Sequence, residues 1–303
     1  MLRNLILGIT NRPTVRRLAT GRAGRVVARR FVAGETIDDA LGVVRGLNER
    51  GMTASLDSLG DNVHDSAAAV AAAGTYRSAL EQISAARLRA NLSVKLTQMG
   101  LELDPEVALG NAALVAARAA EADTTVTLDM EDHRFTELTV DTCLRLAHRY
   151  PDRLGVAVQA YLYRTPGDVE RLIGGRVQVR LCKGAYRESR AIAYTHKDDV
   201  DRACAKLLVR LLESDAYPMI ATHDARLIEF ARKQVSKLGR GLDTFEFQML
   251  YGVRRDLQDE LVREGYRVRV YVPFGSEWYP YFMRRIAERP ANVKFFLRQL
   301  ISR

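Results

Sequence analysis

The sequence predicts a parallel α/β barrel of the (βα)8 TIM type. Three observations favour this fold: short strand-like runs alternate with longer amphipathic stretches, eight such runs occur, and 303 residues suit one barrel with an N-terminal extension. We expect an N-terminal helical arm over residues 1–50 and a barrel domain over residues 51–303.

The strands are expected at residues 52–57, 91–96, 124–129, 154–160, 177–182, 218–222, 243–250 and 268–273. Helices are expected near residues 62–88, 105–121, 133–149, 166–173, 198–214, 224–238, 252–264 and 277–289. The strand interiors are mostly apolar, as a barrel wall requires. Within the arm, Thr36 is a predicted N-cap for a helix over residues 37–49.

The composition indicates a globular cytoplasmic protein with a basic surface. The net charge is +9, but Lys and Arg are spread along the chain, which favours a solvated basic surface. Attraction to an anionic membrane face is the alternative, so a peripheral contact with the inner face of the membrane stays open. Cys143, Cys182 and Cys204 form no CxxC pair and suit a reducing compartment. No run reaches the roughly 20 apolar residues of a membrane-spanning helix.

Polar side chains follow or end most of the predicted strands, which points to an enzyme. They are Asp57, Lys95, Thr97, Asp129, Gln159, Arg180, Lys183, Thr222, His223, Gln248 and Tyr271. In a parallel barrel all strand ends meet at one face, where the active site lies. Burying so many polar groups there without a ligand would cost stability.

The segment YPYFMRRIAE, residues 279–288, is suited to bind a carboxylate. Arg284 and Arg285 are adjacent, and Tyr281 shares a helix face with both. Guanidinium groups present planar, bidentate donors, and Glu288 lies one turn from Arg284 and can fix its rotamer. The alternative is an ordinary basic surface helix.

Two lysines follow strands. Lys183, with Gly184 and Ala185 after it, allows close approach of the backbone to a phosphate or a ring. Lys95 is expected to pair with Asp129 on the neighbouring strand, either to orient a substrate or as a structural ion pair. A Schiff-base role for either lysine remains an alternative.

Other site types are less favoured. His223 is either a catalytic base or a residue that hydrogen-bonds a cofactor. Asp129, Glu131, Asp132 and His133 match no metal-ligand spacing, so no metal site is expected. GRAGR at residues 21–25 precedes every predicted strand and is no dinucleotide fingerprint.

Seven segments over residues 92–289 carry a further signal. They are LSVKLTQMG, TLDMEDH, VAVQAYL, VRLCKGAYRE, ATHD, FEFQMLYGVR, and RVYVPFG followed by YFMRR. Together and in this order they resemble the proline dehydrogenase family, both its monofunctional bacterial form and the matching domain of bifunctional proline-utilisation proteins. The chain is similar to the short monofunctional form. His223 is followed by Asp224, where many relatives have Asn.

The resemblance implies a distorted barrel with the last helix over its mouth and FAD across the strand ends. It implies that Arg284 and Arg285 bind the carboxylate of L-proline, with Glu288 supporting them. The substrate pocket would include Lys95, Asp129, Tyr186, Leu250, Tyr271 and Tyr281. The cofactor would be held by Met130, Gln159, Arg180, Lys183, Gly184, Ala185, Thr222, His223 and Glu288, with Arg180 beside flavin N5.

The implied reaction is hydride transfer from proline C5 to flavin N5, which gives Δ1-pyrroline-5-carboxylate, with electrons passed on to a membrane quinone. The family's quinone would give the basic surface a purpose, a transient membrane contact. Two other functions stay open: a Schiff-base lyase and a basic barrel that binds RNA. No Lys/Arg tract with interleaved aromatic residues occurs, so nucleic acid is not an expected partner.

Overall fold

Eight parallel strands close into a barrel in the computed structural model, with each strand paired to the next and β8 paired to β1. The structure describes residues 28–60 and 63–288, and its description of side chains ends at residue 283. The strands are β1 (Thr53–Ser58), β2 (Ala90–Val94), β3 (Val126–Leu128), β4 (Leu154–Gln159), β5 (Gln178–Cys182), β6 (Pro218–Ala221), β7 (Glu246–Leu250) and β8 (Val268–Phe274). The predicted (βα)8 barrel and its eight strands are confirmed.

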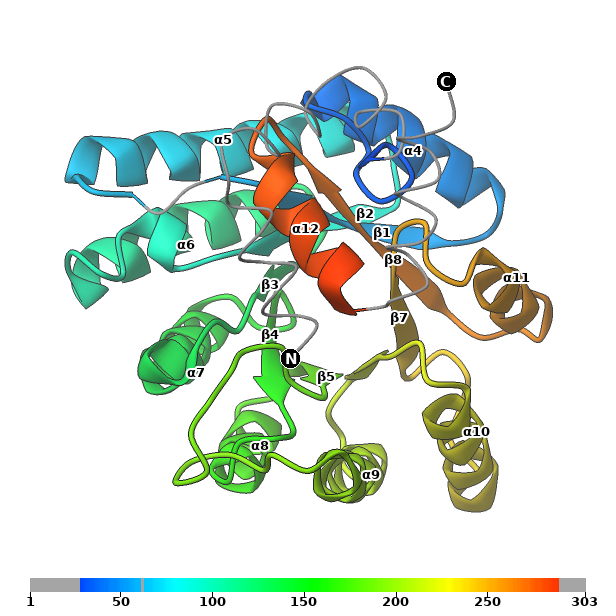
Figure 1. Ribbon diagram of the computed structural model, residues 1–303. Coiled ribbons are helices and arrows are strands. Elements are labelled where there is room, and N and C mark those ends of the chain that lie inside the picture. Colours follow the sequence, from blue (N-terminus) through cyan, green and yellow to red (C-terminus); the bar gives the residue numbers. More distant parts are fainter. Residues whose placement is uncertain (1–27, 61–62, 289–303) are drawn as a thin grey trace.

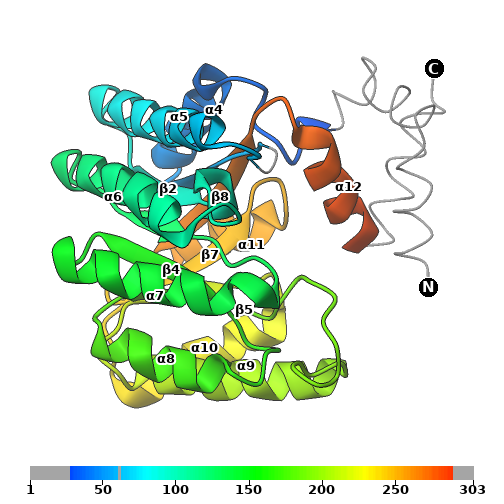
Figure 2. The same ribbon diagram turned by 90° about the vertical axis from the view of Figure 1, so that its left-hand side faces the viewer.

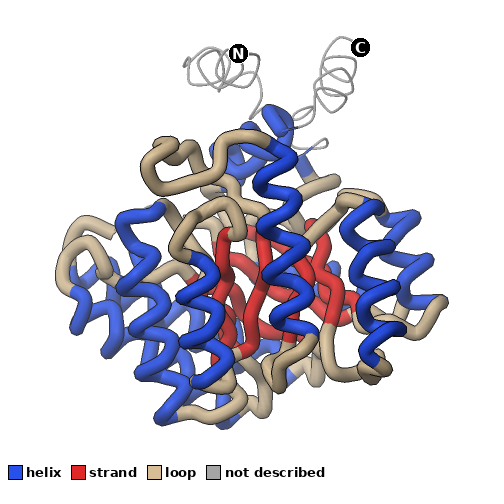
Figure 3. Tube along the Cα trace, turned by 90° about the horizontal axis from the view of Figure 1, so that it is seen from below, coloured by secondary structure: helices blue, strands red, loops and turns tan. Residues whose placement is uncertain are grey.

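Helices surround the barrel (Figures 1 and 3). They are α4 (Ile37–Glu49), α5 (Ser66–Ala85), α6 (Pro105–Glu121), α7 (His133–Arg149), α8 (Thr165–Gly174), α9 (Lys197–Leu212), α10 (Ala225–Leu238), α11 (Arg255–Arg263) and α12 (Trp278–Glu288). The predicted helix over residues 37–49 and the helices predicted after it are present, whereas residues 1–27 of the predicted N-terminal helical arm lie outside the described residues. A short 3-10 turn, η1 (Thr97–Met99), follows β2 and was not predicted.

The helix α12 does not lie beside β8. It crosses in front of the strands in Figure 1 and lies beyond their ends in Figure 2, so it covers one mouth of the barrel. It follows the C-terminal end of β8, and this mouth is therefore the one at which βα loops begin. The predicted position of the last helix is confirmed.

The helix α4 packs against β1 and β8 on the outside of the barrel. Ala40, Leu41, Val44 and Leu47 of α4 belong to the same buried cluster as the barrel wall. The predicted cap is confirmed: Thr36 accepts a hydrogen bond from Asp39 N, and the Asp39 side chain accepts one from Thr36 N. Residues 37–49 thus cover the strand pair that α12 leaves uncovered.

Local sequence signals begin several of the other helices. Asp65, Asp104, Asp132 and Asp224 each accept a backbone hydrogen bond at the N-terminus of α5, α6, α7 and α10, respectively. In α6 the cap is followed by Pro105 at the start of the helix. The backbone N–H at that position has no acceptor within the helix, so the missing N–H of proline costs no hydrogen bond. These helices therefore start at the ends of the preceding βα loops, near the barrel mouth.

Candidate active site

Asp129 lies at the centre of the polar groups inside the barrel mouth. Its Oδ1 accepts a hydrogen bond from Arg180 Nη1 at 2.6 Å, and its Oδ2 accepts one from the Tyr271 hydroxyl at 2.6 Å. Lys95 Nζ lies 3.5 Å from the same Oδ2. Burial would raise the pKa of Asp129, but the charges of Lys95 and Arg180 outweigh it and lower the pKa. Asp129 is therefore a constant anion at neutral pH.

The predicted ion pair of Lys95 with Asp129 is confirmed, but a closer partner is Asp57. Lys95 Nζ donates to Asp57 Oδ1 at 2.5 Å. Burial would lower the pKa of Lys95, yet the two carboxylates raise it above the ordinary lysine value. Lys95 thus remains an ammonium group held between β1 and β3.

Arg180 occupies the middle of β5, not the strand end at which we expected it. Its guanidinium also donates from Nε to Gln248 Oε1 at 2.6 Å and lies 5.4 Å from the centre of the Tyr271 ring. Its partners stand directly after β3 and on β7 and β8, and none of these strands adjoins β5, so the side chain crosses the barrel interior. Only 4% of Arg180 is exposed.

Tyr271 joins the same group from the middle of β8. Burial, and then the charge of Asp129, raise the pKa of Tyr271 well above its ordinary value, so the hydroxyl remains a donor. Its neighbour in register is Leu250 on β7, as expected for two residues that border one pocket. Lys95, Asp129, Arg180 and Tyr271, all predicted site residues, are therefore brought together.

The barrel interior is more polar than the sequence analysis expected. Ser55, Glu246 and Arg269 lie within strands. Ser55 accepts a hydrogen bond from Arg180 across the interior. Glu246 accepts one from Gln248 on its own strand and one from Arg269 on the adjacent strand β8. The expectation of apolar strand interiors is wrong for β1, β7 and β8. The missed signal is alternation: Glu246 and Gln248, and Arg269 and Tyr271, are spaced by two and so share the inward face.

Gln159, at the end of β4, bridges two loops of the mouth. Its Nε2 donates to the Glu131 carbonyl at 2.9 Å, and its Oε1 accepts from Ala185 N at 3.3 Å. Glu131 in turn accepts from Thr97 Oγ1, and burial raises the pKa of Glu131. These bonds order the loops after β2, β3 and β5 around the site.

Lys183, which follows β5, is paired with two carboxylates. Its Nζ lies 2.6 Å from Asp201 Oδ1 and 2.8 Å from Asp224 Oδ2. Burial would lower the pKa of Lys183, but these hydrogen bonds and charges raise it. A Schiff-base nucleophile must be neutral, so the geometry of both Lys95 and Lys183 disfavours the lyase alternative.

His223 and Thr222, after β6, bond to the backbone of the same mouth. His223 Nε2 accepts a hydrogen bond from Leu250 N at 2.9 Å, which occupies the nitrogen that a base would use. The Thr222 hydroxyl accepts from Asp224 N at 3.1 Å. This arrangement disfavours a catalytic base at His223 and fixes Leu250, at the end of β7, against β6.

The predicted cofactor residues Met130, Gly184 and Ala185 and the predicted substrate-pocket residue Tyr186 differ in exposure. Met130 is buried in the barrel core, whereas Tyr186 is 42% exposed. Gly184 has φ +123°, and a Cβ there would lie 2.3 Å from the Tyr161 ring, so only glycine fits. Ala185 offers its N–H beside Gln159.

The predicted carboxylate-binding segment lies on α12. Tyr281 is buried and belongs to a second cluster with Trp278, Phe282 and, from the start of the described chain, Phe31 and Val32. The side chains of Arg284, Arg285 and Glu288 lie outside the described ones, although their backbone belongs to α12.

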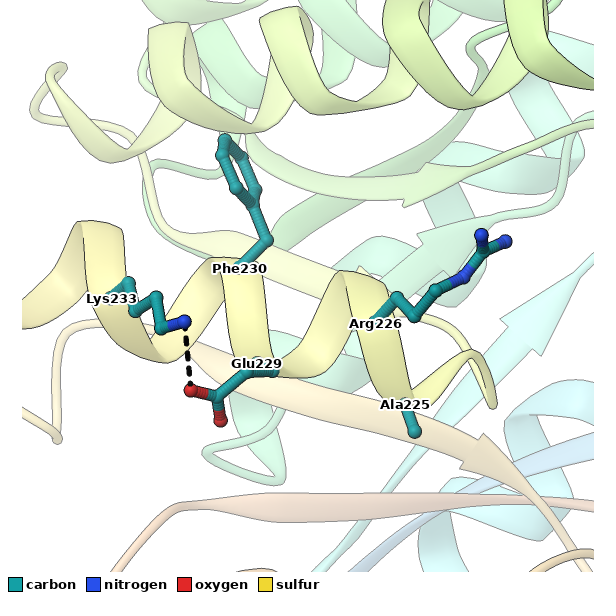
Figure 4. A pocket seen from close by; sticks show the side chains of 5 residues that line it. All are labelled: Ala225, Arg226, Glu229, Phe230 and Lys233. Carbon is teal, nitrogen blue, oxygen red and sulfur yellow. Dashed lines mark ion pairs between the residues drawn. The ribbon is translucent and has the colours of Figure 1, made fainter.

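The hollows lined by the residues named below do not include Asp129 or its hydrogen-bond partners. One, of about 400 Å³, lies on the surface of α10 and is lined by Ala225, Arg226, Glu229, Phe230 and Lys233 (Figure 4). The other, of about 160 Å³, borders the end of β1 and includes Tyr76 and Gln98. Residues 28–60 and 63–288 contain no group of three or more His, Cys, Asp or Glu that could hold a metal ion.

A family model described as proline dehydrogenase matches residues 40–298. The chain belongs to the proline dehydrogenase family. It is therefore an enzyme of proline catabolism that oxidises proline, and its family is one of flavoenzymes.

Individual relatives agree with this assignment. Proline dehydrogenase 1 of Bacillus subtilis (strain 168) is 40% identical over 303 residues, which is 100% of both chains. Proline dehydrogenase of Deinococcus radiodurans is 39% identical over 306 residues, covering 100% of this chain and 98% of that protein.

Solved structures share the barrel. A bifunctional proline utilization A protein has a TM-score of 0.74 and 28% identity over 96% of this chain. Proline utilization A from Bdellovibrio bacteriovorus has a TM-score of 0.82 and 24% identity over 90% of this chain. The chain covers 33% of each of those two proteins.

Within the described part of this proline dehydrogenase, no helix is both long and apolar enough to span a bilayer.

Proposed function

We propose that this enzyme oxidises L-proline to Δ1-pyrroline-5-carboxylate with FAD and passes the electrons on to a membrane quinone. The observation that carries the proposal is the buried Asp129 group, with Lys95, Arg180 and Tyr271 around it, under a helix that bears two adjacent arginines. When bound, FAD would supply the acceptor for the hydride from proline C5, at flavin N5.

The residues present at the mouth fit such a cofactor. Arg180 and Lys183 are cations suited to electron-rich flavin atoms or a diphosphate, and the mouth also carries Thr222 and His223. The exposed ring of Tyr186 and the glycine at 184 lie on the same loop after β5. We assign Met130, Gln159, Arg180, Lys183, Gly184, Ala185, Thr222 and His223 to the cofactor side.

The substrate side would be formed by Asp129, Lys95, Tyr186, Leu250 and Tyr271 together with Tyr281, Arg284 and Arg285 of α12. Proline is a zwitterion, with one carboxylate and one ring amine. The arginine pair would bind the carboxylate, with Glu288 holding the pair, and so fix which ring carbon faces the cofactor. Tyr271 would pack on the proline ring, because its hydroxyl is already held by Asp129.

An anaerobic spectrum tests this proposal. The purified protein should be yellow, and its flavin absorbance should bleach when L-proline is added without oxygen. A colourless protein that cannot be reconstituted with FAD, or bleaching that does not depend on L-proline, would contradict it. Borohydride trapping of a substrate adduct would support the lyase instead.

For the quinone step we propose a transient membrane contact. Residues 1–27 contain six Arg and no Asp or Glu, and residues 289–303 contain four Lys or Arg and no Asp or Glu. Basic segments are attracted to anionic lipid by about 1 kcal/mol per charge near the surface. The protein should float with vesicles of anionic lipid at low salt and not with neutral vesicles. Absence from the anionic vesicles would remove this step.

A further inference from the structure

A chain of buried polar side chains runs from Arg180 down the barrel interior. Gln248 Oε1 accepts from Arg180 Nε at 2.6 Å, and Gln248 Nε2 donates to Glu246 Oε1 at 2.6 Å. Glu246 also accepts from Arg269 Nε at 2.7 Å, and Arg269 Nη1 donates to the Ala54 carbonyl at 3.1 Å. Arg180, Gln248 and Glu246 are all at most 4% exposed.

The donors and acceptors along this series of hydrogen bonds fix the Gln248 amide in one orientation. Its oxygen must face the guanidinium of Arg180, which has no acceptor, and its nitrogen must face the carboxylate of Glu246, which has no donor. Glu246 is held in turn by Arg269. The position of Arg180 Nε is thus set by residues of β7 and β8, below the mouth.

Such a chain is costly as a purely structural element. Buried ion pairs often stabilise a fold less than apolar side chains of the same volume would, because both charges lose their hydration. The hydrogen bond to Gln248 and the Asp129 carboxylate hold the guanidinium of Arg180 from two directions.

We propose that Gln248 and Glu246 are positioning residues for the reaction: through their hydrogen bonds they hold Arg180 at the cofactor. This inference rests on the function proposed above, in which Arg180 lies beside flavin N5. Arg269 completes the chain by holding Glu246 in place.

The test compares Gln248→Met, Gln248→Glu, Glu246→Gln and the exchanged pair Gln248→Glu/Glu246→Gln in the FAD-loaded enzyme. Gln248→Met removes the acceptor for Arg180. Gln248→Glu keeps that acceptor but places two carboxylates together, which disfavours both charges. The exchanged pair restores an acceptor for Arg180 and a donor between positions 246 and 248 with unchanged net charge.

We expect Gln248→Met and Gln248→Glu to lower kcat about tenfold with less than a threefold change in proline KM. The midpoint potential of the bound flavin should fall by about 30 mV, which corresponds to a tenfold change in a two-electron equilibrium. The exchanged pair should recover kcat to within about threefold of the wild type and the potential to within about 15 mV, the equivalent of threefold, and so reveal coupling. Should Gln248→Met fail to fold, the comparison of Gln248→Glu and Glu246→Gln with the exchanged pair still tests the positioning role.

Asn111→Leu is the matched control. Asn111 is a buried amide on α6 that donates to the Met99 carbonyl at 3.0 Å, outside the barrel interior. The Asn111→Leu variant should have lower thermal stability and an unaltered midpoint potential of the bound flavin. A Gln248→Glu enzyme with wild-type kcat and potential, or an exchanged pair no better than Gln248→Glu, would overturn the inference. A wild-type protein that binds no FAD would instead contradict the proposed function.

Discussion

At the scale of single residues, Asp129 joins three other side chains of the site. It accepts from Arg180 and Tyr271 and pairs with Lys95, so side chains from β5, β8 and the end of β2 converge on one carboxylate. The Lys95 contact could be predicted from the sequence, because adjacent strands bring their ends together. The bond to Arg180 could not, since it crosses the barrel.

Arg284→Met should raise the proline KM strongly while flavin remains bound. Loss of a charged, bidentate interaction with the substrate carboxylate is expected to cost about 2–3 kcal/mol, on the order of a hundredfold in KM. Steady-state kinetics with a flavin absorbance spectrum measure both effects. Arg45→Met, at an exposed position of α4, is the control. An unchanged KM for Arg284→Met would rule out the carboxylate-binding role.

Asp224→Asn should lower stability at neutral pH and much less in acid. The hydrogen bond from Lys183 lowers the pKa of Asp224 to about 2. A carboxyl whose pKa is lowered in the folded protein stabilises the fold at pH values above its pKa in the unfolded chain. This stabilisation is lost as pH falls from about 4 to about 2. With both side chains partly exposed, we expect a loss of about 1–2 kcal/mol at pH 7.

Urea unfolding of wild type and Asp224→Asn at pH 7 and at successive values down to pH 2 measures this difference. The two proteins should converge in stability toward the acid end. A gap that stays constant across this range would show that Asp224 stabilises the fold by some other means.

At the scale of elements, the segment before α4 is fastened to the barrel mouth. Ala33 N donates to the Pro273 carbonyl, and Gly275 N donates to the Gly34 carbonyl, both at 2.9 Å. Phe31 and Val32 pack against α12 in the second buried cluster. The helix over the mouth is therefore packed against the segment that leads into α4.

Gly252→Ala should loosen this contact. Gly252 has φ +75°, and a Cβ there would lie 1.7 Å from the Arg30 carbonyl oxygen. Backbone strain alone is expected to cost about 1–3 kcal/mol, and the clash adds to it. The free energy of unfolding in denaturant measures the loss.

Gly42→Ala is the contrasting variant. Gly42 lies in α4, and a Cβ there meets nothing within 4 Å. The Gly42→Ala substitution should raise the free energy of unfolding by about 0.5–1 kcal/mol, because alanine favours helix more than glycine does. Equal effects of the two substitutions would contradict this account of the mouth.

At the scale of the whole molecule, the cofactor should stabilise the fold by mass action. FAD that binds only the folded barrel at 100 times its Kd should raise the free energy of unfolding by about 2.7 kcal/mol. The melting temperature of protein stripped of flavin should therefore rise with added FAD. Riboflavin, which lacks the diphosphate, is the control and should act more weakly if Lys183 binds the phosphates. No rise with FAD would contradict cofactor binding.

The sequence by itself determined the elements of the barrel and much of its mouth. The eight strands, the alternating helices and the Thr36 cap depend on periodicity and nearby side chains, which are local properties. The residues at strand ends could be grouped because parallel strands end at one face. The family resemblance depended on short segments in a fixed order.

Only the tertiary structure decided which side chains meet across the interior. Arg180 bonds to Asp129 and Gln248 through the closed barrel, and the Glu246–Arg269 pair lies beneath them. Such contacts depend on barrel closure and on how the strands are staggered, and no local pattern contains either. The position of α4 over β1 and β8 was likewise decided by packing. The apolar face of a helix can be predicted from its sequence, but the strands against which it packs cannot.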